Sequence, residues 1–177
     1  GESGTGKEML MRAMHAASPR AKAPLRLLNV RSVAANSIES VLFGHEQNAF
    51  PGAFDRQIGA LQHCDGGTLI LDEIDRLDAD LQAKLAETLS TGIVRPVGAK
   101  HGFRVDIRLL CASNLPLSDL TDKQNSIGHF HPDLLEEISQ TKIALPPLRA
   151  RQGDITALSR HFLTRIGEQP GLMQTSI

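Results

Sequence analysis

The sequence predicts an α/β fold in which helices cover both faces of a parallel β-sheet. Short apolar runs typical of buried strands, at residues 24–30, 68–71 and 105–112, alternate with segments of helical periodicity. The chain also begins with a glycine-rich segment followed by a helical one, an arrangement that binds phosphate groups. At 177 residues it is long enough for one domain with a sizeable core.

Composition and charge exclude several classes of protein. The chain has 19 Lys and Arg residues against 20 Asp and Glu, so it lacks the basic excess of a domain that grips nucleic acid. No apolar run approaches the roughly 18 residues of a membrane span, and we expect no membrane partner. The polar first residues argue against a signal peptide. The two cysteines, Cys64 and Cys111, fit a reducing compartment, so we expect a cytoplasmic protein.

Four segments are predicted to be helices: residues 7–17, 36–43, 78–89 and 154–166. The first should bury the face that holds Met9, Leu10, Ala13, Met14 and Ala17. The last carries apolar residues on one side: Ile155, Leu158, Phe162 and Leu163. Pro146 and Pro147 mark a hinge before it. We also expect a long loop at residues 44–60, a turn at 65–67 and a solvated hairpin or loop at 100–104.

The segment at residues 1–8 satisfies most of the phosphate-loop pattern G-x-x-x-x-G-K-[ST]. Its glycines let backbone N–H groups turn toward a phosphate, and Lys7 would reach the β- and γ-phosphates. Glu8 stands where Ser or Thr normally offers a hydroxyl to Mg²⁺. The candidate nucleotide-binding residues are Gly1, Glu2, Ser3, Gly4, Thr5, Gly6, Lys7 and Glu8. In isolation, such a segment can also be a flexible terminus.

Two further observations bear on this candidate site. A phosphate loop normally follows a buried strand, so we expect the chain to be a fragment whose first strand is missing. The apolar run at residues 68–71 leads into Asp72 and Glu73, where one carboxylate can hold Mg²⁺ and a second can polarise the attacking water. An ordinary acidic strand end is the alternative for that pair alone.

Asn114 follows the apolar run at residues 105–112, at the carboxyl end of a predicted strand. Ligands bind at that end of parallel sheets, so its amide could contact the γ-phosphate or the attacking water. A simple turn residue is equally consistent with Asn114 taken alone.

These pieces, in this order, resemble the AAA+ domain of bacterial enhancer-binding proteins, the sigma-54 interaction domain. The resemblance runs from residue 1 to about residue 162. Its motifs are GESGTGKE at 1–8, SVLFGHE at 40–46, DGGTLILDEID at 65–75, DLQAKL at 80–85, RVDIRLLCASN at 104–114 and LPPLRARQGDI at 145–155. The family characteristically carries Glu at the position of Glu8.

The resemblance implies a role for each matching residue. Lys7 corresponds to the Walker A lysine, Asp72 and Glu73 to the Walker B pair, and Asn114 to sensor I. Asn29 matches the asparagine thought to hold the Walker B glutamate until the γ-phosphate is sensed. The implied catalytic residues are therefore Glu73, Asn114 and Asn29, and the implied cofactors are ATP and Mg²⁺, with Asp72 holding the metal through the nucleotide.

The sequence departs from the family at the loop that touches sigma-54, whose motif is GAFTGA. The aligned residues are Asn48, Ala49, Phe50, Pro51, Gly52 and Ala53. Asn48 replaces the first Gly, and Pro51 replaces a Thr, which removes a hydroxyl and a backbone donor. An added Pro is poorly suited to a loop that must rise and fall, so these changes argue against productive engagement of sigma-54.

A second departure concerns the two arginines that reach into the neighbouring subunit's site in this family. The segment that resembles FREDLYYRL is FHPDLLEEI at residues 130–138, so His131 and Glu137 stand at the two arginine positions. A trans arginine contributes roughly 10³–10⁵ in rate to phosphoryl transfer. We therefore expect weak or absent assembly-stimulated ATP hydrolysis. We do not expect Arg149 and Arg151 to take the place of the two missing arginines.

The resemblance also implies an organisation and a set of partners. We expect a nucleotide-binding α/β subdomain at residues 1–147 and the beginning of a helical lid at 148–177. The implied partners are RNA polymerase with a sigma factor and further copies of the chain, as a dimer or hexameric ring. DNA would be bound only by a separate domain of a response regulator or enhancer-binding protein. The alternatives are a fully active sigma-54 promoter-opening ATPase and a ligand-sensing or interaction domain acting with the housekeeping sigma factor.

Overall fold

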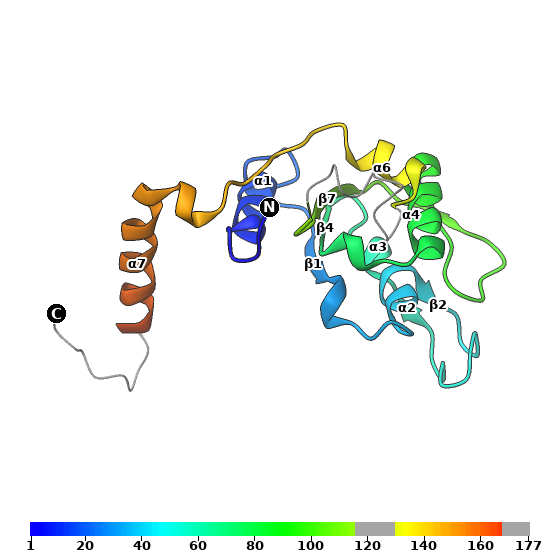
Figure 1. Ribbon diagram of the computed structural model, residues 1–177. Coiled ribbons are helices and arrows are strands. Elements are labelled where there is room, and N and C mark those ends of the chain that lie inside the picture. Colours follow the sequence, from blue (N-terminus) through cyan, green and yellow to red (C-terminus); the bar gives the residue numbers. More distant parts are fainter. Residues whose placement is uncertain (116–129, 168–177) are drawn as a thin grey trace.

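The computed structural model describes residues 1–115 and 130–167. At its centre lies a three-stranded parallel sheet in the order β1 (Leu25–Asn29), β4 (Thr68–Asp72), β7 (Arg108–Ala112), which Figure 1 shows. The register pairs Asn29 with Asp72 and Asp72 with Ala112, so the three strands end in step. The predicted parallel α/β fold is confirmed.

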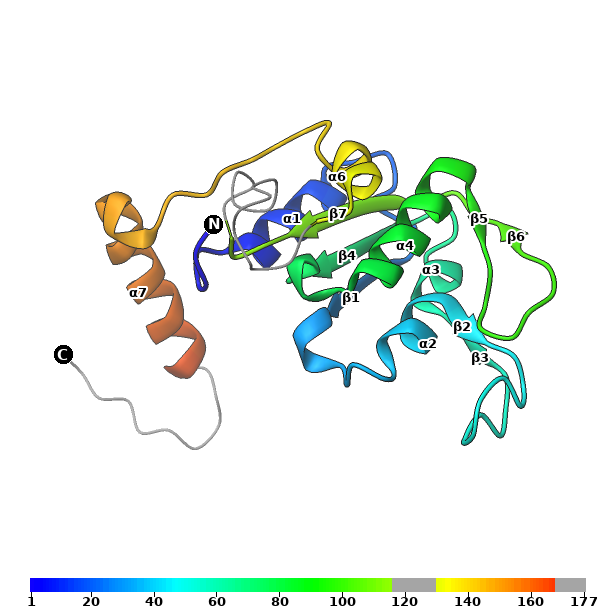
Figure 2. The ribbon, with the colours of Figure 1, turned by 45° about the vertical axis from the view of Figure 1, so that its right-hand side comes forward.

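Helices cover both faces of this sheet. They are α1 (Lys7–Ala16), α2 (Ile38–Phe43), α3 (Ala60–His63), α4 (Ala79–Thr91) and α6 (Pro132–Ile138), and a further helix, α7 (Gln152–Gly167), follows. Single 3-10 turns connect some of them: η1 (Val30–Ser32), η2 (Ile74–Arg76) and η3 (Leu148–Ala150). Figure 2 shows α1 and α4 on opposite sides of the sheet.

The central strand β4 separates two apolar clusters because successive side chains of a strand point to opposite faces. Leu69 and Leu71 belong to the larger cluster, to which α2, α3, α4 and α6 contribute. Ile70 faces the other way, toward Met11 of α1. All three β4 residues are fully buried. The run at residues 68–71 was therefore correctly predicted to be a buried parallel strand.

The predicted buried face of the first helix is wrong. The buried residues of α1 are Met11 and His15, whereas Met9 is 61% exposed. His15 lies in the interior because its Nδ1 is within 2.9 Å of the Thr68 hydroxyl, which satisfies a polar ring among apolar neighbours. The apolar pattern did not reveal this contact, because it counts Met9 as a core residue and does not count the polar His15.

Two short antiparallel hairpins extend from the α/β body. One pairs β2 (Gly44–His45) with β3 (Gln57–Ile58), and the other pairs β5 (Ile93–Val94) with β6 (Phe103–Arg104). The second confirms the expected hairpin near residues 100–104. The strand predicted at 105–112 is shorter than expected, because the amide of Val105 bonds Gly92 and so continues the hairpin.

Helix α7 stands apart from the sheet at the end of a long extended segment (Figure 1). Several of its apolar residues are exposed, including Ile155, Phe162 and Leu163, whereas Leu158 is partly buried. No helix in the described ranges is long and apolar enough to cross a membrane.

Candidate nucleotide-binding site

The candidate site lies at the carboxyl edge of the sheet. Asn29 ends β1, Asp72 ends β4, and Asn114 follows β7 by two residues. Because the parallel strands end in step, the sheet brings these three polar residues to one edge, although 85 positions separate the first from the last. Ligands of open α/β sheets bind at this edge.

The phosphate loop, residues 1–8, precedes α1 directly. Gly4 and Gly6 have φ angles of 77° and 88°, in the left-handed region that glycine adopts without strain. No atom lies within 4 Å of a Cβ built at either glycine, so conformation rather than space requires them. Thr5 is buried, and its hydroxyl donates to the Glu2 carbonyl at 2.8 Å. The loop is thus folded on itself at the N-terminus of a helix, where an anion is favoured.

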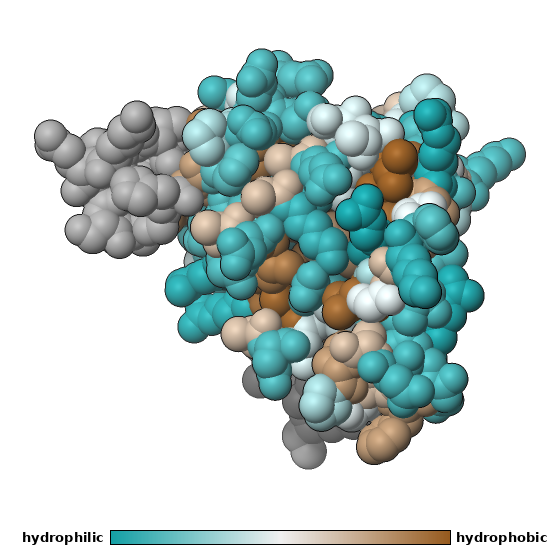
Figure 3. Space-filling view, turned by 90° about the vertical axis from the view of Figure 1, so that its right-hand side faces the viewer, coloured by the Kyte–Doolittle hydropathy of each residue, from teal (hydrophilic) through white to brown (hydrophobic). Residues whose placement is uncertain are grey.

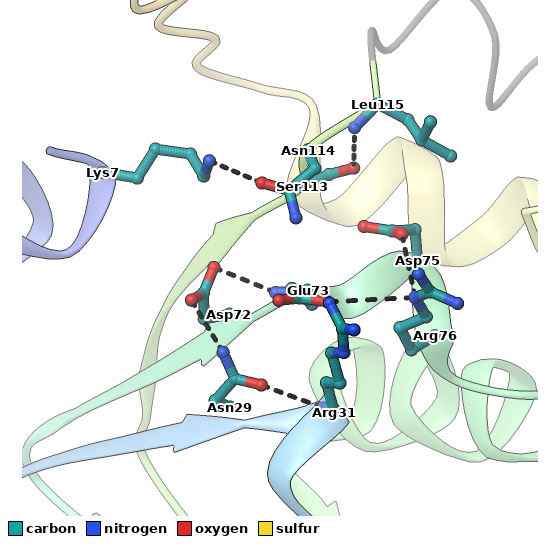
Figure 4. A network of polar contacts seen from close by, with 10 residues as sticks. All are labelled: Lys7, Asn29, Arg31, Asp72, Glu73, Asp75, Arg76, Ser113, Asn114 and Leu115. Atoms are coloured by element: carbon teal, nitrogen blue, oxygen red, sulfur yellow. Dashed lines mark hydrogen bonds and ion pairs between the residues drawn. The ribbon is translucent and has the colours of Figure 1, made fainter. Parts of the chain in front are cut away.

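Lys7 uses its ammonium group to join the phosphate loop to the sheet edge. Its Nζ donates to the carbonyls of Gly1 at 2.7 Å and Glu2 at 2.8 Å, and to Oδ1 of Asn114 at 2.7 Å (Figure 4). An ammonium has three hydrogens, so every donor of Lys7 is engaged. The predicted Walker A lysine and sensor I residue therefore lie in contact. A phosphate that binds Lys7 must displace at least one of these oxygens.

Asn29 contacts Asp72 in this structure, and its expected hold on Glu73 until the γ-phosphate is sensed stays a prediction. Its Nδ2 donates to Oδ2 of Asp72 at 3.0 Å, and its Oδ1 accepts from the amide of Arg31 at 2.9 Å (Figure 4). The other oxygen of Asp72 accepts from the amide of Glu73 at 3.0 Å. The register explains the contact, since Asn29 and Asp72 are direct neighbours across the sheet.

Glu73 lies just beyond β4 in a left-handed backbone conformation, with φ 55° and ψ 45°. Few residues other than glycine adopt it, and such strain is often found at functional sites. The side chain is 13% exposed, and its Oε2 lies 3.8 Å from Nε of Arg76. That buried oxygen has no hydrogen-bond partner among the described residues. Glu73 is therefore a carboxylate paired with the charge of Arg76, and its Oε2 can still accept a hydrogen bond.

The donor chemistry of this edge fits Mg²⁺ bound together with a nucleotide. In the described part of the chain, no group of three or more His, Cys, Asp or Glu residues could hold a metal ion. Mg²⁺ commonly takes one or two carboxylates and completes its shell with phosphate oxygens and water. Asp72, at the end of β4, supplies such a carboxylate.

Sequence reasoning missed the cis role of two arginines. Both guanidinium nitrogens of Arg149 donate to the carboxylate of Glu2, each at 2.8 Å, and hold its pKa below the usual value. Arg151 donates from Nη2 to the carbonyl of Thr5 at 2.9 Å. Both contacts span nearly the whole chain, so no local pattern could have revealed them. The expectation that these arginines do not replace the trans arginines stays a prediction.

The two positions expected to carry degenerate arginine fingers lie on or beside α6, outside the phosphate site. His131 precedes that helix, and its amide donates to Oε1 of Gln82 on α4 at 2.7 Å. Its ring nitrogen Nδ1 lies 4.0 Å from the carboxylate of Asp133. Glu137 is partly exposed on α6. The described contacts of these residues include none with the phosphate loop.

The loop between β2 and β3 accommodates both of its unusual residues. The Ala53 amide donates to the Phe50 carbonyl at 3.0 Å, which closes a turn with Pro51 and Gly52 at its centre. Gly52 has a φ of 100°, so this is a type II turn, where Pro followed by Gly is favoured. Asn48 has a φ of 62°, a conformation that asparagine tolerates better than most residues. The substituted loop is therefore well formed.

This loop lies at the opposite end of the α/β body from the phosphate loop (Figure 1). The ring of Phe50 packs edge-on against His45, with centroids 4.9 Å apart, while Phe54 is 79% exposed. Figure 3 views this side of the molecule, where apolar residues are scattered over a largely hydrophilic surface. Any effect of nucleotide on the loop must therefore pass through the body of the domain.

A phosphate loop before a helix, an acidic strand end beside it and a polar residue after the adjacent strand define a P-loop NTPase domain of the AAA+ class. A structure described as the P-loop NTPase domain of a sigma-54 transport activator from E. coli has a TM-score of 0.52 at 21% identity, which bears on the fold alone. Residues 1–144 match the Sigma-54 interaction domain family. The chain belongs to that family.

Individual relatives agree with this assignment. The Nif-specific regulatory protein of Sinorhizobium fredii is 43% identical over 169 residues, which cover 96% of this chain and 28% of that protein. The DNA-binding transcriptional regulator NtrC of Escherichia coli is 41% identical over 172 residues, covering 97% and 36%. The chain thus spans well under half of each of these two proteins.

Solved structures of NtrX from Brucella abortus are also similar. One superimposes with a TM-score of 0.88 at 32% identity and covers 100% of this chain and 39% of NtrX. A second, a complex with ATP, has a TM-score of 0.85 at 31% identity and covers 99% and 37%. These likenesses extend over the phosphate loop, the sheet and α7.

Proposed function

We propose that this chain is the ATP-binding module of a bacterial sigma-54-dependent-type transcriptional regulator, with weak trans-activated hydrolysis. The bond between Lys7 and Asn114 carries the proposal, because it joins the phosphate loop to the sheet edge where Asp72 and Glu73 lie. Structures of related NtrX with ATP and ADP support the choice of nucleotide.

We infer a task for each of these side chains. Lys7 and the phosphate-loop amides would bind the β- and γ-phosphates, and Asp72 would hold Mg²⁺, which neutralises phosphate charge when bound. Glu73 would accept a proton from the attacking water, for which its unpartnered Oε2 is suited. Asn114 would orient the γ-phosphate or that water. Asn29 would fix the carboxylate of Asp72, which it already contacts.

The proposal of weak turnover rests on the trans contribution. In a ring, the neighbouring subunit would present the region of His131 and Glu137 to the triphosphate. Glu137 would place a negative charge near phosphate oxygens, which repels rather than stabilises. Homo-oligomers, RNA polymerase with a sigma factor, a separate DNA-binding domain, a cytoplasmic location and a lid that begins with α7 are further parts of the proposal.

The test is ATP turnover measured against protein concentration in the full-length chain, beside a Lys7→Ala variant. Turnover per subunit that stays near the Lys7→Ala level while an ATP analogue still binds supports a nucleotide-responsive module. Turnover that rises steeply with concentration and vanishes in Lys7→Ala contradicts weak trans activation. Absence of analogue binding contradicts the proposed function itself.

One observation favours a second candidate, a fully active sigma-54 promoter-opening ATPase. The type II turn at Pro51 and Gly52 shows that the substituted loop keeps an ordered tip. Promoter opening by purified polymerase with sigma-54 would separate this candidate from the first. Phe50→Ala should then abolish promoter opening and leave ATP binding unchanged.

A further inference from the structure

The extended segment that leads to α7 crosses the phosphate loop and touches it at three successive points. We call residues 145–151 the strap. At its start, a Cβ built on Gly1 would lie 2.8 Å from the Leu145 carbonyl oxygen, so the two backbones are in close contact. Arg149 then binds Glu2 with two hydrogen bonds, and Arg151 binds the Thr5 carbonyl.

Arg149 and Glu2 form a paired, planar contact that fixes direction as well as distance. Both hydrogen bonds measure 2.8 Å, which is the geometry in which guanidinium and carboxylate match. The side chains are 72% and 56% exposed, so the pair alone stabilises the fold little. We therefore look for the effect of this pair in the orientation of α7, which the strap connects to the phosphate loop through three contacts.

Arg151 supplies a more enclosed contact. Its side chain is 23% exposed and also reaches Asp154 at 3.2 Å, in the first turn of α7. Its Nε is buried without a hydrogen-bond partner in the described part of the chain. One guanidinium thus joins the phosphate loop to the start of α7.

The strap touches the same residues that Lys7 holds. Lys7 donates to the carbonyls of Gly1 and Glu2, the two residues that contact Leu145 and Arg149. A phosphate that draws Lys7 away must release at least one of these carbonyls or Asn114. The carbonyls of Gly1 and Glu2 belong to residues that the strap contacts, and the strap runs directly into α7.

We propose that Arg149 and Arg151 are positioning residues that couple nucleotide binding at the phosphate loop to the orientation of α7. This inference rests on the proposed binding of a nucleoside triphosphate. It assigns the coupling to cis contacts made by the strap, and it makes Glu2 an acceptor for the strap rather than for the nucleotide.

The test measures orientation directly in the full-length chain. Nitroxide labels on Ser90→Cys of α4 and Ala157→Cys of α7, both exposed positions, report the distance between the body and α7. Distances are recorded with and without a non-hydrolysable ATP analogue and Mg²⁺, together with the Kd of the analogue. The variants are Arg149→Ala, Glu2→Gln, the double substitution of these two, and Arg151→Ala, and the matched control is Arg160→Ala on the exposed side of α7.

The parent should show a distance change when the analogue binds. Arg149→Ala and Glu2→Gln should each broaden the distance distribution and raise the Kd roughly two- to fivefold, the range expected for an exposed pair. The double substitution should be no worse than either single one, because both remove the same contact. Arg160→Ala should behave as the parent.

Two results would overturn the inference, and they are distinguishable. If the parent binds the analogue and Arg149→Ala and Arg151→Ala both give the same distances and Kd as the parent, the coupling is wrong while the proposed function stands. If the parent binds no analogue, the proposed function fails and the coupling fails with it.

Discussion

Lys7 connects the phosphate loop to the edge of the sheet, and its contacts set a prediction at the scale of one residue. Replacing it by Ala removes three charge-assisted hydrogen bonds and the cation that would meet the phosphates. We expect the Kd for an ATP analogue to rise by about 10- to 100-fold, since hydrogen bonds to charged groups contribute about 1.5–3 kcal/mol. Calorimetric titration measures this, and an unchanged Kd would contradict the site.

A second prediction concerns Glu73, where a substitution should reduce ATP hydrolysis without changing ATP binding. Glu73→Gln keeps the size of the side chain but removes its ability to accept a proton. We expect ATP to bind as in the parent, and any measurable turnover to fall by about 10²–10⁴-fold. Single-turnover hydrolysis checks this. Glu87→Gln is the matched control, because Glu87 is exposed on α4 and lies outside the candidate site.

Cys111 lies in β7, and burial raises the pKa of its thiol to about 12. Burial also raises the pKa of Cys64. At pH 8 the thiolate fraction of Cys111 should therefore be about 10⁻⁴, and only the thiolate reacts. We expect neither thiol to react with a disulfide reagent in the folded protein at pH 8. Both should react once the protein is unfolded in denaturant, and rapid reaction in the folded state would contradict the raised pKa values of the two thiols.

The loop between β2 and β3 carries a prediction at the scale of an element. Pro51 occupies a position where its fixed φ matches the native turn, so it restricts the unfolded chain at no cost to the fold. Pro51→Thr should lower the free energy of unfolding by about 0.4–1 kcal/mol and increase amide exchange at Ala53, whose N–H closes the turn. Denaturant unfolding and hydrogen exchange measure both effects. An unchanged exchange rate at Ala53 would contradict the rigid turn.

At this scale the sequence predicted most elements, and the exceptions have physical causes. Strand β4 and helix α4 have strong local signals, with Asp78 bonding the Leu81 amide and Gly92 ending the helix at a φ of 67°. The buried face of α1 depends instead on a polar contact between His15 and Thr68. The contact of Asn29 with Asp72 was not predicted, because it is set by sheet register, which no local pattern contains.

At the scale of the whole molecule, the replaced arginines predict a gain of function. If His131 and Glu137 are the cause of weak turnover, restoring both as arginines should supply the missing cations to the neighbouring site. We expect His131→Arg combined with Glu137→Arg to raise turnover per subunit at least tenfold at high protein concentration, with little change at low concentration. A parent that already turns over steeply with concentration would contradict this prediction.

The control for that experiment is Glu136→Arg, which changes the charge of α6 by the same amount as Glu137→Arg at a neighbouring position. It should leave the dependence on concentration unchanged. The sequence led to this prediction through family positions, whereas the contacts of Arg149 and Arg151 with the phosphate loop became visible only in three dimensions. Long-range contacts between irregular segments leave no periodic signal.

Because the three strands end in step, a change in the length of one strand would disturb the candidate site. Asn29 and Asp72 are paired across the sheet, and Asn114 follows Ala112, the other partner of Asp72, by two residues. Their relative positions therefore depend on the apolar strands that lead to them. One residue inserted into β7 would advance Asn114 by about 3.3 Å and turn its side chain to the other face. The bond to Lys7 would then be lost without any change to a polar residue. The lengths of the apolar strands therefore set the positions of the polar site residues. A change in strand length would damage the site as much as the loss of a carboxylate.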